Sequence, residues 1–80
     1  MPQNLKNITL KDFQDFLKFK GLKVIRRKGG HEVWSGTTLL RPIILQSHID
    51  PVPEFIIRNN MRTLNCDKQE LLDFLNKKQE

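Results

Sequence analysis

The 80-residue sequence has a single cysteine, Cys66, and no long hydrophobic run. One cysteine cannot form an internal disulfide, and it excludes a zinc site built from several cysteines. The longest apolar stretch is a few residues around 43–45, whereas a membrane-spanning helix needs roughly 20. The first residues have neither the hydrophobic region of a signal peptide nor a lipidation motif. These absences predict a cytoplasmic protein without a membrane anchor.

The chain also lacks repeats, low-complexity tracts and linkers rich in proline, glycine or serine. We therefore expect one domain over residues 1–80, with its core at about 9–75. A domain of this size buries only about 60% of the surface that its unfolded chain exposes, which excludes a large multidomain enzyme with an enclosed substrate cavity. A dinucleotide-binding domain of several βαβ units is excluded as well. With 38% hydrophobic and 29% charged residues, the chain is too apolar to be disordered.

Positive charge is concentrated in the first half of the chain. The 14 Lys and Arg residues exceed the nine Asp and Glu residues, which gives a formal net charge of +5. Up to Arg41 there are nine basic and three acidic residues, a balance of +6, and the remainder has a balance of −1. This asymmetry indicates a polyanionic partner on the basic side of the fold. The alternative is an ordinary solvated surface on a basic protein.

Residues 9–20 have the pattern of an amphipathic helix. Thr9 is a favourable N-cap, Asp12 lies where the helix dipole stabilises a carboxylate, and Gly21 supplies a C-terminal stop. Ile8 and Phe13 have the spacing of a hydrophobic staple. The apolar residues at helical spacing are Leu10, Phe13, Phe16 and Leu17.

Three strands are predicted next, over 22–28, 31–35 and 39–45. Gly29-Gly30 is typical of a two-residue hairpin turn, and a second turn is expected near 36–37. Because Pro42 falls inside the third strand and has no N–H to donate, we expect that strand at a sheet edge.

Two helices are expected after a loop at 46–52. Pro53 is placed at the first helical position of a helix over 53–63. This helix is expected to bury Phe55, Ile56, Ile57, Met61 and Leu64. The last helix, capped by Asn65, Cys66 or Asp67, carries Leu71, Leu72, Phe74 and Leu75. The order α-β-β-β-α-α predicts an α+β two-layer fold like that of a double-stranded-RNA-binding domain, with a three-stranded antiparallel sheet and helices on one face.

His31 is the first candidate for chemistry. It follows the Gly29-Gly30 turn and the basic run Arg26-Arg27-Lys28. An imidazole can transfer a proton near neutral pH, and cations beside it would attract a phosphodiester. Metal-free RNA cleavage needs both: a base for the 2′-hydroxyl and positive charge at the phosphate. From spacing alone, the alternative is a surface histidine beside a solvated charge run.

Other combinations of reactive residues are less favoured. A metal site from His31, His48 and Asp50 lacks any recognised ligand spacing. Cys66 lies at a helix start but has no histidine nearby in sequence, so we expect a small half-buried residue. Strand alternation places Trp34 on the opposite face from His31, where it could stack a base but is expected in the core.

The stretch Arg26-Arg27-Lys28-Gly29-Gly30-His31-Glu32-Val33-Trp34 resembles the HicA (YcfA-like) family of bacterial toxins, small mRNA interferases with a double-stranded-RNA-binding-domain-like fold. The family has a basic strand, a glycine, a small residue that is usually serine, a histidine and a short apolar strand. Gly29 matches the glycine and His31 the histidine, whereas Gly30 stands in place of the serine.

The second half is similar as well. Residues 42–48, 53–64 and 66–75 match the family's third strand with its histidine-containing loop and its two final helices, and His48 matches the loop histidine. The chain departs from the family at Glu54 and Phe55, where glycine and threonine are usual, and at 59–63, which lacks Gln-Ala-Gly.

The resemblance implies the toxin of a type II toxin–antitoxin system, an endoribonuclease that cleaves mRNA without metal or cofactor and inhibits translation. His31 would be catalytic and His48 a possible accessory group. A HicB-like antitoxin would cover the active site. The residues expected to bind RNA are Arg26, Arg27, Lys28, Gly29 and Gly30.

Two rival functions stay open. A non-catalytic RNA-binding module of the same fold would use the basic strand for phosphate contacts and bind RNA without cutting it. A protein-interaction domain would bind an acidic partner through its basic half and would not bind RNA at low salt.

Overall fold

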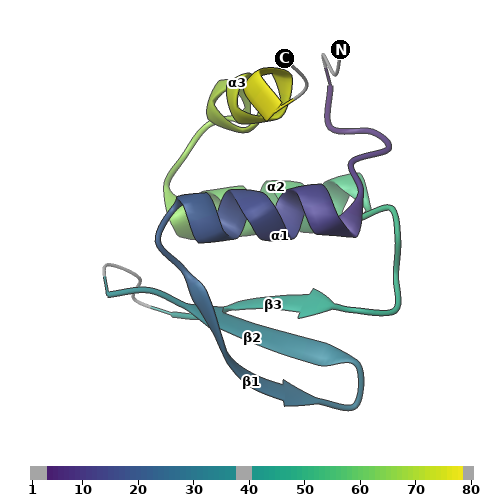
Figure 1. Ribbon diagram of the computed structural model, residues 1–80, viewed down its shortest axis with the longest axis vertical. Coiled ribbons are helices and arrows are strands. Elements are labelled where there is room, and N and C mark those ends of the chain that lie inside the picture. The colour runs from purple at the N-terminus through teal and green to yellow at the C-terminus, as the bar shows by residue number, and fades with distance from the viewer. Residues whose placement is uncertain (1–3, 38–40, 79–80) are drawn as a thin grey trace.

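The computed structural model describes residues 4–37 and 41–78. Its elements are, in chain order, α1 (Leu10–Phe19), β1 (Lys23–Lys28), β2 (His31–Ser35), β3 (Ile43–Gln46), α2 (Glu54–Leu64) and α3 (Lys68–Lys78). The strands form an antiparallel sheet in the order β1-β2-β3. Helices α1 and α2 lie over one face of this sheet, and α3 packs against α1 farther from the sheet (Figure 1). The predicted α+β class and the order α-β-β-β-α-α are confirmed.

The first helix forms as its sequence predicts. The Thr9 side chain accepts a hydrogen bond of 3.1 Å from the backbone N–H of Asp12, which satisfies one free donor of the first turn. After the helix ends, Gly21 adopts a φ of +87°, a conformation that costs glycine little. Phe13, Phe16 and Leu17 are buried.

The hairpin between β1 and β2 turns at the two predicted glycines. Gly29 has a φ of +57° and Gly30 a φ of +81°, so both central residues of the turn are left-handed, as tight hairpin turns often require. Lys28 and His31 are paired on either side of this turn. The register shifts between Val24 and Arg26, which marks a β-bulge in β1.

Three details of the second half differ from the sequence prediction. Strand β3 begins at Ile43 and does not include Pro42, because proline cannot supply a ladder hydrogen bond. Residues 39 and 40, also predicted in this strand, lie outside the described residues. The strand is at the sheet edge, as predicted. Pro53 is the N-cap of α2 and not its first helical residue. Phe55 is not buried: it is 65% exposed, and the helix instead turns Ile57, Asn60 and Met61 inward.

The boundary between α2 and α3 resolves the predicted capping choice. Asn65 ends α2 in a left-handed conformation, with a φ of +55°. The Asp67 side chain accepts a hydrogen bond of 3.0 Å from the backbone N–H of Glu70, so Asp67 is the residue that caps α3.

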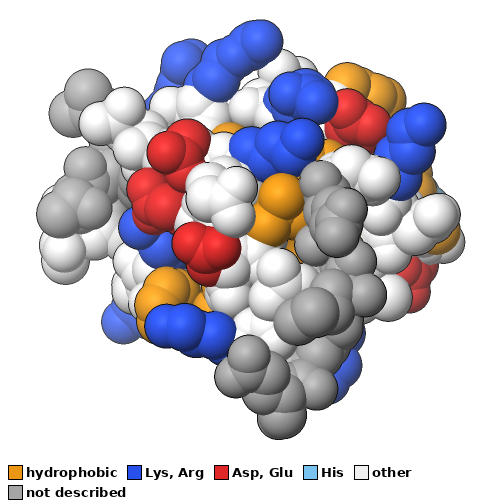
Figure 2. Space-filling view, turned by 90° about the horizontal axis from the view of Figure 1, so that it is seen from above, with side chains coloured by type: hydrophobic (Ala, Val, Ile, Leu, Met, Phe, Trp, Pro, Cys, Tyr) orange, Lys and Arg blue, Asp and Glu red, His pale blue; other side chains and the backbone are white. Residues whose placement is uncertain are grey.

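Ion pairs join α3 to α1. Lys78 contacts both Asp12 and Asp15, and Lys20 contacts Glu70 at 3.0 Å. Seen from the α3 side, Asp and Glu side chains lie next to Lys and Arg side chains on this surface (Figure 2). The hydrogen bonds from Lys78 and from Lys11 lower the pKa of the Asp15 carboxyl to about 2. The helical side of the protein therefore has much of its charge paired.

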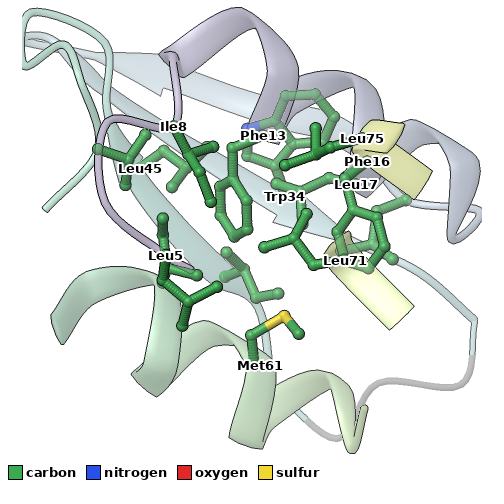
Figure 3. Close-up of a cluster of buried hydrophobic side chains, with 14 of the residues drawn as sticks. Leu5, Ile8, Phe13, Phe16, Leu17, Trp34, Leu45, Met61, Leu71 and Leu75 are labelled. Carbon is green, nitrogen blue, oxygen red and sulfur yellow. The ribbon is translucent and has the colours of Figure 1, made fainter. Parts of the chain in front are cut away.

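One hydrophobic cluster lies between the helices and the sheet (Figure 3). Trp34 is 1% exposed and is part of this core, which confirms the expected role. The cluster also includes Leu5 and Ile8, which precede the predicted core range of 9–75. The helices supply most of the rest through Phe13, Phe16, Leu17, Ile57, Met61, Leu71, Leu72 and Leu75. In the described part of the chain, no helix has the length and apolar character needed to cross a membrane.

Candidate RNA-binding face and histidine site

The sheet has one solvent-exposed side, which we call the open face. In an antiparallel sheet, paired residues point to the same side. Val33 pairs with Arg26 and Ile44, and His31 pairs with Lys28 and Gln46. Glu32 and Trp34, at the alternate positions of β2, are buried under the helices. Ser35, on the same side as His31 and Val33, pairs with Lys23. Among the described strand residues, the open face therefore carries three cations (Lys23, Arg26 and Lys28) and a histidine but no carboxylate.

The bulge in β1 decides which cations lie on this face. Val24 pairs with the buried Trp34, and strict alternation would also turn Arg26 toward the helices. The register shift after Val24 instead pairs Arg26 with Val33 and Lys28 with His31, both on the open face. Arg27 pairs with Glu32 and turns to the helix side. The predicted basic run is thus divided between the two sides of β1.

His31 is exposed at the first position of β2. Its neighbours across the sheet are Lys28 on β1 and Gln46 on β3. An ammonium group in this position favours an anion beside the imidazole, and no carboxylate among the described strand residues of the open face competes for it. The arrangement is suited to holding a phosphodiester next to His31.

The turn brings Gly30 against His48, which is distant in sequence. Ser47 donates to the Gly30 carbonyl twice, from its backbone N–H at 2.7 Å and from its hydroxyl at 3.0 Å. These bonds fix the loop after β3 to the hairpin. A Cβ atom added to Gly30 would lie 2.9 Å from His48 Nδ1. The structure therefore places His48 beside the residue that precedes His31, and leaves no room there for a serine side chain unless the ring moves.

Glu32 is a buried acid directly behind His31. It is 5% exposed, and it accepts hydrogen bonds from Gln14 Nε2 at 2.9 Å, Trp34 Nε1 at 3.1 Å and Arg27 Nε at 3.4 Å. A buried carboxylate is tolerated when it is paired and hydrogen-bonded in this way. The network attaches Arg27 to the protein core.

An apolar groove of about 410 Å³ runs along the edge strand β3. It lies between β3 and the start of α2, and His31 is among its lining residues. Phe55 and Ile44, both exposed, form part of its wall. The groove thus joins a hydrophobic surface and an unpaired strand edge to the candidate histidine.

The remaining candidates do not join this site. Cys66 is half-buried, as expected, and burial raises the pKa of its thiol, which makes the reactive thiolate scarcer. Its Sγ lies 3.7 Å from the sulfur of Met61. Within residues 4–37 and 41–78, no three side chains of His, Cys, Asp or Glu come together as a metal-binding group.

Sequence reasoning missed the Glu32 network and the groove. Strand alternation carried a signal for the first, since the rule that puts Trp34 in the core puts Glu32 on the same side. The groove left no comparable signal, because Phe55 has the helical spacing of a core residue.

No protein-family model matches the chain, and neither does any curated protein or solved structure with which it was compared.

Proposed function

We propose that this protein is a HicA-like toxin, an endoribonuclease that cleaves mRNA in the cytoplasm without a metal and is neutralised by an acidic antitoxin. The observation that carries the proposal is the open face, where His31 lies beside Lys28 and near Arg26 with no carboxylate among the described strand residues. This surface attracts a polyanion and offers it a group that can transfer a proton near neutral pH. The resemblance of residues 26–34 to the family supports the same function.

The proposed reaction uses the RNA itself as nucleophile. His31 takes the proton of a 2′-hydroxyl, the 2′-oxygen forms a bond to the adjacent phosphorus, and the bond from phosphorus to the 5′-oxygen breaks. The products are a 2′,3′-cyclic phosphate and a 5′-oxygen that must gain a proton. His48, whose ring lies against Gly30, is the accessory candidate to supply it. Lys28 and Arg26 stabilise the negative charge that develops on the phosphate.

Expression of the wild type and His31→Ala in a bacterial host tests the proposal. The wild type is expected to arrest growth, and His31→Ala is expected to allow it, because loss of a general acid–base group lowers a rate by about 10²–10⁴-fold. His31 is exposed, so its replacement should change stability by no more than about 0.5 kcal/mol. Purified wild type should cut RNA in the presence of a chelator.

A folded His31→Ala protein that still cuts RNA would reject the catalytic assignment. A wild type that binds RNA but never cuts it would favour the non-catalytic RNA-binding module. Circular dichroism on both proteins is the control for folding.

The groove along β3 is the proposed docking surface for the antitoxin. A partner seated there would cover His31, which lines the groove, and would pack apolar side chains against Phe55 and Ile44. Acidic groups on the partner would meet Lys28 and Arg26, which speeds the encounter and fixes its register. The unpaired edge of β3 offers backbone hydrogen bonds to an added strand.

Labelling with diethyl pyrocarbonate measures this occlusion. His31 is expected to react in the free protein and to be protected in the complex. A Phe55→Ser variant is expected to weaken the complex without loss of RNA cleavage, since Phe55 is exposed and outside the core. Equal labelling of His31 in both states, with growth restored, would show that inhibition does not work by covering the active site.

A further inference from the structure

A second basic surface lies on the other side of β1, in a cleft between that strand and α1. The cleft has a volume of about 280 Å³. Lys18, Lys23 and Arg27 line it, together with Gln14, Leu22 and Trp34. Lys18 comes from the last turn of α1 and Arg27 from the second half of β1. Lys23, the first residue of β1, pairs with Ser35, so it lies where the cleft meets the open face. The fold therefore gathers charges that are up to nine residues apart in the sequence.

These cations are available to a ligand. Within the described residues, the ammonium groups of Lys18 and Lys23 have no ion pair or hydrogen bond. Arg27 uses only its Nε, which donates to Glu32. Its terminal N–H groups have no hydrogen bond to any described residue. A guanidinium with free terminal N–H groups is suited to two parallel hydrogen bonds to a phosphate.

The Glu32 network orients Arg27 through one long contact: its Nε lies 3.4 Å from the Glu32 carboxylate, and the rest of the side chain is largely exposed. The carboxylate is buried and is itself fixed by Gln14 and Trp34. An arginine anchored through Nε loses less conformational freedom on binding than an unattached one. The buried acid thus positions a cation of the cleft and also satisfies the indole of Trp34.

We propose that this cleft binds the phosphodiester backbone of single-stranded RNA on one side of the cleavage point. The inference rests on the proposed function and adds a subsite to it. Because β1 is an edge strand, an RNA strand can pass from Lys28 on the open face around the edge to Arg27. Lys23 lies five residues from Lys28, which is about 16 Å along the strand. A very short RNA bound at His31 does not reach Lys23 and Lys18, whereas a longer one does.

The test compares two double variants in a His31→Ala background, so that RNA is bound but not cut. Lys18→Gln with Lys23→Gln removes two charges from the cleft. Lys6→Gln with Lys68→Gln removes the same charge from exposed lysines that do not line it. The affinity for a single-stranded RNA of about 12 nucleotides and for a dinucleotide is measured over a range of salt. Circular dichroism confirms that each variant is folded.

For the longer RNA, the cleft variant is expected to flatten the log–log salt dependence by about 1.4, or 0.7 per lost contact. The control variant should change it far less, and neither variant should affect the dinucleotide. Lys18→Arg with Lys23→Arg should retain the wild-type slope. Because the chain has one tryptophan, the Trp34 indole N–H resonance should shift with the longer RNA through the Glu32–Arg27 contact.

If the cleft variant and the control variant flatten the salt dependence of RNA binding equally, the inference is overturned. The effect would then be a general attraction of RNA to surface lysines. Equal loss for the dinucleotide would overturn it too. If an acidic peptide such as oligoglutamate shifts the Trp34 resonance and RNA does not, the occupant is a protein and the RNA subsite is wrong. The outcome is independent of the proposed catalysis: a cleft that binds RNA in a protein that never cuts it would refute the nuclease and keep the subsite.

Discussion

Replacement of Gly30 by alanine tests the contact between the hairpin and His48. Gly30 has a φ of +81°, a region that costs an L-residue about 1–2 kcal/mol. The new Cβ would also lie 2.9 Å from His48 Nδ1, so the ring must move. The ring is exposed and can rotate, and an off-rotamer shift costs about 0.5–1.5 kcal/mol.

The penalty of Gly30→Ala thus has a backbone part and a steric part, which a double-mutant cycle separates. With His48→Ala present, the steric part disappears and the backbone part stays. Gly29→Ala is the matched control, because Gly29 has a φ of +57° and nothing within 4 Å of an added Cβ. Its penalty should be the same with and without His48.

Urea denaturation measures these differences. A chain of 80 residues has a free energy of unfolding of about 4–12 kcal/mol, so all the variants should fold. A coupling of about 0.5–1.5 kcal/mol between Gly30→Ala and His48→Ala corresponds to a midpoint difference of about 0.5–1.5 M urea, for a slope of about 1 kcal/mol per M. A coupling below about 0.5 kcal/mol would refute the packing of His48 on Gly30. It would also show that His48 does not exclude a serine side chain at position 30.

Three further predictions concern charge. RNA affinity should fall with rising salt, and alanine at both Arg26 and Arg27 should flatten the log–log slope by about 1.4; affinity independent of salt would contradict the phosphate contacts. Asp15→Asn should lower stability at neutral pH, and the difference should vanish between about pH 4 and pH 2. The reason is that the folded pKa of Asp15 is lowered to about 2 from about 3.9 in the unfolded chain, so the stabilisation is present above the unfolded value and is lost as the carboxylate is protonated. Glu32→Leu should cost about 1–3 kcal/mol in urea unfolding by leaving the buried Trp34 indole N–H without an acceptor. Glu54→Gln, which weakens only the solvent-accessible ion pair with Arg58 at the start of α2, should cost less than about 1 kcal/mol.

Local signals predicted most of the fold. The cap at Thr9, the stop at Gly21 and the turn at Gly29-Gly30 each act through their own backbone preferences, and the structure has all three where the sequence put them. Errors arose where packing decides. The spacing of Phe55 fits the buried side of α2, but the way α2 rests against β3 leaves it exposed, and no local pattern carries that information.

The candidate site was predicted in part. His31 and the basic run Arg26-Arg27-Lys28 could be predicted as site residues directly from the sequence. His48 was a candidate as well, but the sequence did not predict where it lies in the fold. Its contact with Gly30 depends on the pairing of β2 with β3, a long-range feature. The division of the basic run between two surfaces depends on the bulge after Val24, which shifts the register by one residue.

The bulge also explains how so basic a strand fits this small sheet. With strict alternation from Val24, both Arg26 and Lys28 would turn toward the helices, where the described strands offer a single acid, Glu32. Cations that are desolvated without a partner are costly. With the bulge, Arg27 is the one cation of the run 26–28 that turns to that side, where it meets Glu32, one cation for one carboxylate. Within residues 4–37 and 41–78, Arg26 and Lys28 then have no ion pair on the open face, which is the arrangement that a surface for a polyanion requires.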